Sequence, residues 1–419
     1  MTAPENEFRS LKGLIDSRLP GHGLPRPFYH DALLYRAEMQ TIWRQGWLFA
    51  GHSCQIPNPG DYFLYDMDGD SVIVLRGDDG RVGALDNVCR HRGSILVREP
   101  QGNLKKSIVC PYHQWTYDRS GRLLQHRGMQ AGLDDAQLGL HQVQARELEG
   151  LIFISLARAP LDFAPFEAAV APLVRPQGLE RAHVAQILDY DIQANWKLVW
   201  ENNRECFHCN VNHPQYIKAN FDHYNADDTS PHVAERLKAV TDRLEARLAS
   251  QGMSVRKETG MTEFPDPESG VWFAANRTPL VEGYVSESMD GHQVAPLMGD
   301  YRDPEVGTLR VRSLPNFWIH ASCDHSVAVR LTPDGLAHTR ARMIWLVDAK
   351  ARPGEDYTLE ALLPFWKLTA EQDWEICANQ QRGVNSQAYV PGPLSTFKEY
   401  NLERFLRWYV QEMKAGIEK

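Results

Sequence analysis

The sequence predicts an α+β protein in which a small all-β domain precedes a larger domain of antiparallel strands and helices. Between residues 48 and 157, short apolar runs such as SVIVLRG (71–77) and LIFISL (151–156) alternate with clusters of Gly, Asp, Asn and Pro. That pattern is typical of short strands joined by turns. From residue 183 onward, strand-like runs are mixed with long helical patterns. With 419 residues, the chain is long enough for two or three domains.

Each segment of the chain carries its own pattern. Residues 1–47 are expected to form an N-terminal helical segment, because apolar side chains between 30 and 47 recur at helical spacing. Residues 158–182 contain four prolines and are expected to connect the all-β domain (48–157) to the second domain (183–419). The elements expected in the second domain are a strand at 183–194, a helix from Trp196, a charged helix at 232–251, strands at 270–275, 307–320, 326–332 and 338–348, and helices at 357–381 and 402–415.

The composition excludes several classes of protein. A formal net charge of −9 argues against nucleic-acid binding, which favours a basic surface. Seven cysteines are an odd number, so full disulfide pairing is excluded. The first 25 residues have no apolar core typical of a secretory signal, and no window approaches the roughly 20 apolar residues of a membrane span. We therefore expect a cytoplasmic protein with reduced thiols and no membrane partner.

One group of metal-ligating residues lies in the all-β domain. Cys89 and His91 form a Cys-x-His pair, and eighteen residues later Cys110 and His113 form a Cys-x2-His pair. Two thiolates and two imidazoles suit a [2Fe–2S] cluster in which the cysteines bind one iron and the histidines the other. A structural zinc site uses the same ligand types. The mixed pairs in a β-rich segment favour the cluster.

A second group lies in the run ENNRECFHCNVNHP (201–214). Glu205 and His208 are three residues apart, so on a helix they would share a face. His213 precedes Pro214, which is expected to end that helix. Two histidines joined by a carboxylate make the ligand set of non-haem Fe(II) oxygen chemistry. The Cys206-x2-Cys209 pair could indicate redox or zinc chemistry, but we interpret it as two packing residues.

A candidate carboxylate lies far downstream, on the helix expected at 360–383. Asp373 falls on the same helical stripe as Trp366 and Thr369, which makes it an acid on a mostly apolar face. A buried carboxylate needs a cation or a metal to offset its desolvation. The alternative is an aspartate paired with a buried arginine or placed at a helix end.

The two groups together resemble a known family. CRHRGS (89–94) and CPYHQWTY (110–117) resemble the Rieske motif of oxygenase alpha subunits, and 201–214 resembles the iron motif acid-x2-His-x4-His of the same family. The resemblance covers nearly the whole chain. It implies a Rieske [2Fe–2S] domain followed by a helix-grip catalytic domain that binds mononuclear Fe(II). The implied cluster ligands are Cys89, His91, Cys110 and His113, and the implied iron ligands are His208, His213 and Asp373.

The resemblance also implies how the two centres cooperate. Glu205 takes the place of a bridging acid, which hydrogen-bonds across a subunit boundary to a Rieske histidine, here His113, and connects it to His208. Most ring-hydroxylating members have Asp at this place, and Glu is a feature of members that act on quaternary ammonium compounds. The family arranges its subunits head to tail, so a homotrimer is expected. Electrons are expected from a separate flavin/iron–sulfur reductase that uses NAD(P)H, because this chain has no G-x-G-x-x-G fingerprint.

The segments 279–291, 314–320 and 380–393 resemble the glycine betaine and stachydrine (proline betaine) demethylases. The implied reaction is a monooxygenation: O2-dependent hydroxylation of an N-methyl group, with release of formaldehyde and the demethylated amine. A quaternary ammonium group is usually bound by aromatic faces. Trp318, followed two residues later by His320, is the candidate for this role. The candidate partners of a substrate carboxylate are Arg310, Arg312 and Arg330.

Other functions remain open from the sequence. An aromatic ring-hydroxylating or O-demethylating Rieske oxygenase shares both metal sites and differs only in the pocket. A demethylase of stachydrine, carnitine or choline-like substrates is a second alternative. A non-catalytic electron carrier predicts no mononuclear iron, and a zinc-stabilised binding module predicts neither iron centre.

Overall fold

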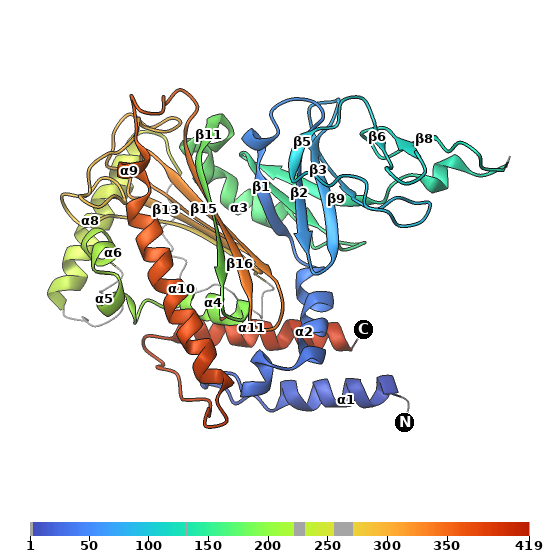
Figure 1. The fold of residues 1–419 in the computed structure, drawn as a ribbon. Helices are drawn as coiled ribbons and strands as arrows, with labels where there is room; N and C mark the ends of the chain where they lie inside the picture. The colour runs from blue at the N-terminus through green and yellow to red at the C-terminus, as the bar shows by residue number, and fades with distance from the viewer. Residues whose placement is uncertain (1–2, 131, 222–230, 255–270, 419) are drawn as a thin grey trace. The chain divides into compact units, whose positions relative to one another are not determined.

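The computed structural model describes residues 3–130, 132–221, 231–254 and 271–418. The chain divides into two compact units (Figure 1). The smaller unit is Arg44–Leu161, and the larger unit combines Met1–Trp43 with Asp162–Lys419. The N-terminal segment that the sequence set apart over residues 1–47 thus falls largely within the larger unit.

The smaller unit is built of β-strands, as the spacing of apolar runs and turns predicts. Its main sheet has seven antiparallel strands in the order β1-β10-β9-β4-β3-β2-β5, and a smaller sheet has the order β6-β7-β8. Asp68 and Gly69 join β2 to β3 with φ values of 48° and 83°, the left-handed backbone that tight hairpins need. The strands are β1 (Leu48–His52), β2 (Asp61–Met67), β3 (Asp70–Arg76), β4 (Val82–Asp86), β5 (Gln101–Asn103), β6 (Ile108–Val109), β7 (Thr116–Tyr117), β8 (Leu123–Gln125), β9 (Gln142–Leu148) and β10 (Leu151–Ser155).

A buried cluster of side chains forms one core of this unit. Ile73 and Leu75 of β3 and Leu85 of β4 belong to it, together with Cys89 and Cys110. The two cysteines are 3% and 1% exposed. Both thiols that the sequence assigned to the cluster therefore face the hydrophobic core of the smaller unit.

The larger unit contains a six-stranded antiparallel sheet in the order β11-β16-β15-β14-β13-β12. The run predicted as one strand over 307–320 forms two, because residues 314–316 turn between β13 and β14. The first residue of the strand predicted at 270–275 lies outside the described residues. The strands are β11 (Ala182–Ile192), β12 (Phe273–Thr278), β13 (Thr308–Ser313), β14 (Phe317–Ala321), β15 (Ser326–Pro333) and β16 (Thr339–Asp348).

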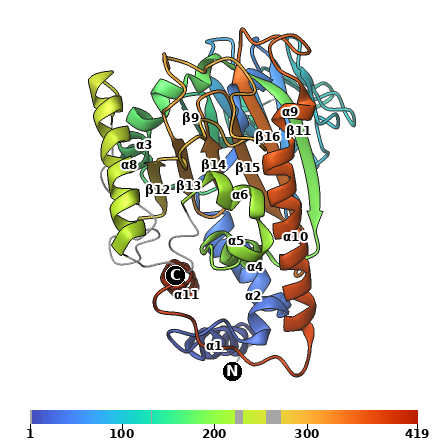
Figure 2. The same cartoon turned by 90° about the vertical axis from the view of Figure 1, so that its left-hand side faces the viewer.

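Helices cover this sheet and close one end of it. The views from two sides place α4, α5, α6 and α10 on one face of the sheet, whereas α1, α2 and α11 lie together at one end (Figures 1 and 2). Residues 158–182, predicted as a connection, include α3 with a proline in its first turn, where the missing N–H costs nothing. The helices are α1 (Ala3–Asp16), α2 (Ala32–Glu38), α3 (Ala164–Val174), α4 (Trp196–Asn203), α5 (Cys209–Asn212), α6 (Pro214–Ala219), α8 (Pro231–Ser250), α9 (Leu359–Leu362), α10 (Pro364–Asn385) and α11 (Tyr400–Ile417).

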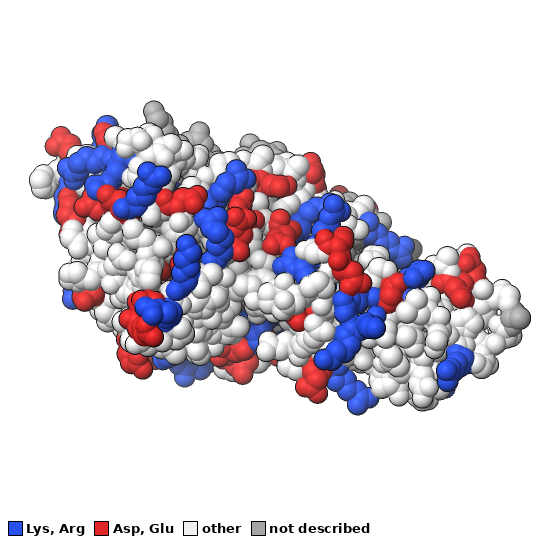
Figure 3. Space-filling view, turned by 90° about the horizontal axis from the view of Figure 1, so that it is seen from above, with Lys and Arg blue, Asp and Glu red and all other residues white. Residues whose placement is uncertain are grey.

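The surface carries charges of both signs. Within the described part of the chain, no helix has the length and apolar character needed to cross a membrane. On the face drawn in Figure 3, basic and acidic side chains of the described residues are interspersed. A large single-sign patch of the kind that binds nucleic acid is not present among the described residues of that face.

Candidate metal centres and pocket

Two loops of matching geometry present the Cys/His pairs of the smaller unit. In the first, the N–H of Gly93 donates to the Cys89 carbonyl at 3.0 Å, and Gly93 has a φ of 72°. In the second, the N–H of Gln114 donates to the Cys110 carbonyl at 3.0 Å, and Gln114 has a φ of 59°. Each loop thus closes over its cysteine with a left-handed residue four positions later, a conformation that glycine adopts most easily.

The four side chains predicted for the cluster come together. His91 Nδ1 lies 3.1 Å from His113 Nδ1, and both rings are half-buried, whereas both thiols are buried. Trp115 stacks on His91 with ring centroids 4.9 Å apart. The Tyr117 hydroxyl lies 3.4 Å from Cys89 Sγ, within hydrogen-bonding reach of the sulfur. Two buried sulfurs and two imidazoles nearer the surface fit a Rieske [2Fe–2S] cluster, which these four side chains would hold.

In the larger unit, Glu205 and His208 lie in a turn and not on a helix, so that part of the prediction is wrong. α4 ends at Asn203, and α5 begins at Cys209. The Glu205 carboxylate accepts the backbone N–H groups of Phe207 and His208. This local bonding competes with helical hydrogen bonds and explains why the helix stops. The turn nevertheless brings the two side chains together.

The elements on either side of this turn are firmly fixed. The Asn195 side chain accepts the Lys197 N–H at 3.0 Å and caps α4. Lys197 Nζ then pairs with Glu38 of α2 at 2.6 Å, and both side chains are fully buried. Pro214, expected only to end a helix, begins α6 directly after His213. The turn therefore lies between α5 and α4, and these contacts anchor α4.

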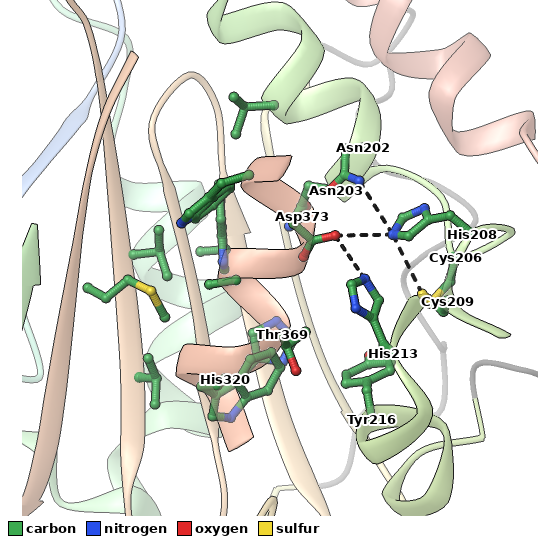
Figure 4. A pocket seen from close by; sticks show the side chains of 18 of the residues that line it. Asn202, Asn203, Cys206, His208, Cys209, His213, Tyr216, His320, Thr369 and Asp373 are labelled. Atoms are coloured by element: carbon green, nitrogen blue, oxygen red, sulfur yellow. Dashed lines mark hydrogen bonds and ion pairs between the residues drawn. A yellow bond between two sulfur atoms is a disulfide. The ribbon is translucent and has the colours of Figure 1, made fainter. Parts of the chain in front are cut away.

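His208, His213 and Asp373 converge at one point (Figure 4). Asp373 Oδ1 lies 3.2 Å from His208 Nε2 and 2.9 Å from His213 Nε2. The other nitrogen of each ring is already engaged: His208 Nδ1 is 2.6 Å from Glu205 Oε1, and His213 Nδ1 is 2.8 Å from Gln372 Oε1. Second partners of this kind orient metal-binding imidazoles. The donor set and its orientation fit a 2-His-1-carboxylate iron site.

Hydrogen bonds among these side chains keep His208 and Asp373 charged. Burial lowers the pKa of His208, but hydrogen bonds to Asp373 and Glu205 outweigh burial and raise the pKa to about 10. Burial raises the pKa of Asp373, but hydrogen bonds from His208 and His213 outweigh it and hold that pKa below its ordinary value. Asp373 therefore stays ionised beside two imidazole nitrogens. A divalent cation binds to such a group by displacing the imidazole protons.

Cys206 and Cys209 are joined by a disulfide, so the expectation that they are reduced packing residues is wrong. Cys209 Sγ lies 3.9 Å from His208 Nε2. The donor atoms of His208, Cys209 and His213 lie within 4.8 Å of one another, which is close enough for a shared metal. A cysteine binds a metal as a thiolate, however, and a disulfide sulfur is not a thiolate. Asp373 is therefore the better third donor.

A pocket opens beside these donors, between the sheet and α10. Trp318 and His320 of β14, the two substrate-site candidates, both line it, and so does Arg312 of β13. His320 packs on Trp366 of α10 with ring centroids 4.1 Å apart. Burial and the nearby Arg310 and Arg312 charges hold the pKa of His320 well below its ordinary value, so this imidazole is neutral. Arg310 and Arg330 do not line the pocket.

Gln372, Trp366 and Trp374 were not assigned to this site from the sequence. Gln372, which orients His213, lies 159 residues away in the chain and carries no motif of its own. Trp366 and Trp374 extend the aromatic lining from α10. Helical spacing was the signal that could have found both tryptophans, since Trp366, Asp373 and Trp374 are seven and eight positions apart on one helix face.

The comparisons with known proteins agree with this geometry. The family "Ring hydroxylating alpha subunit (catalytic domain)" matches residues 179–415, and "Rieske [2Fe-2S] domain" matches residues 46–143. The chain belongs to the Rieske oxygenase alpha subunits. This Rieske oxygenase is an oxidoreductase with a [2Fe–2S] cluster and a mononuclear iron, as the resemblance implied.

Two curated relatives match this Rieske oxygenase over almost its whole length. The glycine betaine monooxygenase oxygenase subunit of Chromohalobacter salexigens is 37% identical, over 97% of this chain and 89% of the relative. The protein of the same name from Pseudomonas aeruginosa is 38% identical, over 98% and 93%. A solved quaternary ammonium Rieske monooxygenase in complex with L-carnitine has a TM-score of 0.67 at 17% identity, over 96% of this chain and 98% of that one. At that identity the likeness shows the fold alone.

Proposed function

We propose that this Rieske oxygenase is the oxygenase component of a monooxygenase that demethylates a quaternary ammonium betaine of the glycine betaine type. The observation that supports the proposal most is the match to glycine betaine monooxygenase oxygenase subunits along nearly the whole chain, at 37–38% identity. The match spans the segments that contain the pocket-lining residues as well as those that contain the metal-site residues.

The pocket has the chemistry that such a substrate needs. A quaternary ammonium has no N–H to donate, so aromatic faces bind it by cation–π attraction. Trp318, Trp366 and Trp374 line the pocket together with Tyr216. We propose that Trp318 is part of the surface that takes the methyl groups, with the neutral His320 beside it. A neutral imidazole adds no repulsion toward a cation.

The metal sites supply the redox chemistry of the proposed reaction. When bound, the cluster delivers electrons and the iron activates O2. We propose that Cys89, His91, Cys110 and His113 bind the cluster and that His208, His213 and Asp373 bind the iron. Glu205 and Gln372 each keep a proton on the Nδ1 atom of one histidine, so that both Nε2 atoms face the metal position.

The proposed reaction is a two-electron monooxygenation. One N–CH3 group, O2, two electrons and two protons give N–CH2OH and water. The hydroxymethyl group then loses a proton from its hydroxyl as the C–N bond breaks. Formaldehyde leaves, and the electron pair of that bond stays on the nitrogen of the demethylated amine.

The proposed partners are a reductase and further copies of this chain. The relatives are named as oxygenase subunits, which supports a separate reductase. We propose that this reductase is a flavin/iron–sulfur protein using NAD(P)H, and that the oxygenase is a homotrimer in which Glu205 accepts a hydrogen bond from His113 of the neighbouring subunit. The cytoplasmic location expected from the sequence stays a prediction.

A substrate panel tests the proposal. The oxygenase loaded with both iron centres is combined with a flavin/iron–sulfur reductase and NADH. Formaldehyde is measured with glycine betaine, stachydrine, L-carnitine and choline, and hydroxylated product is measured with benzoate. We expect the highest kcat/KM with glycine betaine and none with benzoate. Turnover of benzoate alone would instead establish the ring-hydroxylating alternative. Preference for L-carnitine or choline would show that the substrate is a different quaternary ammonium compound.

A further inference from the structure

We propose that Arg312 is a specificity-determining residue that binds the carboxylate of the substrate, directly beside the tryptophan that takes its ammonium group. This inference rests on the proposed function and names how the pocket selects a zwitterion. It places the anchor for the negative end on β13 and the aromatic surface for the positive end on β14.

The register of the sheet brings the two side chains together. Arg312 of β13 pairs with Trp318 of β14, Trp318 pairs with Val329 of β15, and Val329 pairs with Met343 of β16. Directly paired residues point to the same face of a sheet, with Cβ atoms about 4.5–5.5 Å apart. All four residues line the pocket. They form one row along the wall of the pocket, with Arg312 at the β13 end and Trp318 as its cross-strand neighbour.

The dimensions of this row suit a small betaine. The charged groups of glycine betaine are separated by a single methylene, so its two ends must be bound by neighbouring side chains. Arg312 is 5% exposed and Trp318 is 6% exposed, so both lie at the bottom of the pocket. Arg312 Nε donates to Asn203 Oδ1 at 3.3 Å, which steadies the guanidinium plane. A planar guanidinium of this kind is the best partner for a carboxylate.

The other two arginines are placed differently. Arg310 lies two residues before Arg312 on the same strand face, but it donates to Asn220 Oδ1 at 2.9 Å and does not line the pocket. Arg330 pairs with Phe317 in register, and it lines a separate depression formed by β11, β15 and β16. Of the three candidates that the sequence left open, only Arg312 faces the pocket.

The charges of the pocket support the same assignment. Its two carboxylates, Glu205 and Asp373, are engaged with His208 and His213. Among the described residues that line the pocket, Arg312 is the only one with a permanent positive charge. An anionic group of a substrate thus has one strongly attractive side-chain partner outside the metal site.

The same charge gives selectivity. A quaternary ammonium without a carboxylate, such as choline, brings only a positive charge next to the buried guanidinium, and like charges repel strongly away from bulk water. A betaine cancels that repulsion with its own carboxylate. Specificity therefore comes from repulsion of the wrong ligand as well as attraction of the right one.

Arg312→Gln in the holoenzyme tests the inference. Isothermal calorimetry measures the Kd of glycine betaine and of choline, and formaldehyde release gives KM and kcat. Charge-assisted hydrogen bonds predict that the variant weakens glycine betaine binding by about 10- to 100-fold and raises KM accordingly. We expect choline binding to be unchanged or stronger, so that the ratio of the two affinities falls. Arg312→Lys should lose less, because the charge remains.

Arg330→Gln is the matched control, since it removes an arginine of the same sheet outside the pocket. The visible spectrum and the iron content of each variant show that it is folded and loaded. An unchanged Kd for glycine betaine in Arg312→Gln overturns the inference, and so does an equal loss of affinity for glycine betaine and choline. In either case, formaldehyde release by the wild-type enzyme still supports the proposed function. Absence of formaldehyde from every betaine with the wild-type enzyme overturns the proposed function, and the calorimetric Kd values still decide the role of Arg312.

Discussion

Glu205 Oε1 lies 2.6 Å from His208 Nδ1, the ring nitrogen that faces away from Asp373. The carboxylate thereby fixes the tautomer of the imidazole and leaves Nε2 for the metal. Glu205 is also the residue proposed to meet His113 of the next subunit, so one side chain has two partners to satisfy. This relationship makes Glu205 the first residue to test.

We predict that Glu205→Ala retains both iron centres but loses coupled turnover. The variant keeps all seven proposed metal ligands, so its spectrum and iron content should match the wild type. Its kcat for formaldehyde release should fall by about 10- to 100-fold or more, because loss of a partner of this kind typically costs that much. Glu205→Gln, which can still accept a hydrogen bond, should lose less. Full activity of the alanine variant with the same reductase would contradict the bridging role.

We predict that Asp373→Ala loses mononuclear iron. The change removes the oxygen that lies 2.9 Å from His213 Nε2 and 3.2 Å from His208 Nε2, leaving two histidines and no carboxylate. Iron analysis should show that the mononuclear site binds metal at least about tenfold more weakly, with the visible spectrum of the cluster unchanged. Glu375→Ala is the matched control, because Glu375 is an exposed acid on the same helix. Full iron occupancy in the Asp373 variant would remove Asp373 from the ligand set.

The proposed ligands could be predicted from the sequence because each lies in a local pattern. Cys89, His91, Cys110 and His113 are defined by spacing within two short loops, and Asp373 by its place on a helical stripe. The sheet was predicted from strand-like runs alone. The partner of each strand was not, because register depends on contacts between distant segments.

What the sequence could not supply depends on those distant contacts. The pairing of Arg312 with Trp318 selects one arginine from three, and it follows only from the β13–β14 register. Gln372 reaches His213 only because α10 packs beside α6, which begins directly after His213. The helix expected through Glu205 fails because its carboxylate bonds to the local backbone, a competition that residue spacing does not express.

A buried acid near the site gives stability a defined pH dependence. Burial raises the pKa of Glu201 to about 7, although the Tyr29 hydroxyl donates to it at 2.8 Å and Lys197 lies nearby. Between pH 4.5, its ordinary pKa, and about 7, the folded state keeps a proton that the unfolded chain releases. The free energy of unfolding must therefore fall as pH rises through this window.

We predict that Glu201→Gln removes this slope, because an amide does not titrate. The wild type should lose on the order of 2 kcal/mol between pH 5 and pH 7.5 from this group, and the variant should not. Melting temperatures of both proteins at the two pH values measure the difference. Identical pH slopes for the wild type and the variant would show that Glu201 titrates normally in the folded protein.

The disulfide between Cys206 and Cys209 predicts a thiol count. Cys54, Cys89, Cys110, Cys323 and Cys377 are free, which leaves five thiols of the seven cysteines. Alkylation of denatured, metal-stripped protein without reductant should label those five, and prior reduction should raise the number to seven. Mass analysis of the peptide that contains His208 should show it lighter by two hydrogen atoms before reduction. Labelling of all seven without reductant would show that the pair is reduced in the purified protein.

The central claim is tested most directly by the stoichiometry of one reaction. The holoenzyme is given its reductase, NADH and glycine betaine with 13C-labelled methyl groups, while O2 uptake is recorded and the products are identified by NMR. We predict one labelled formaldehyde and one dimethylated amine for each O2 consumed. Oxygen uptake that yields hydrogen peroxide and no labelled formaldehyde would contradict it.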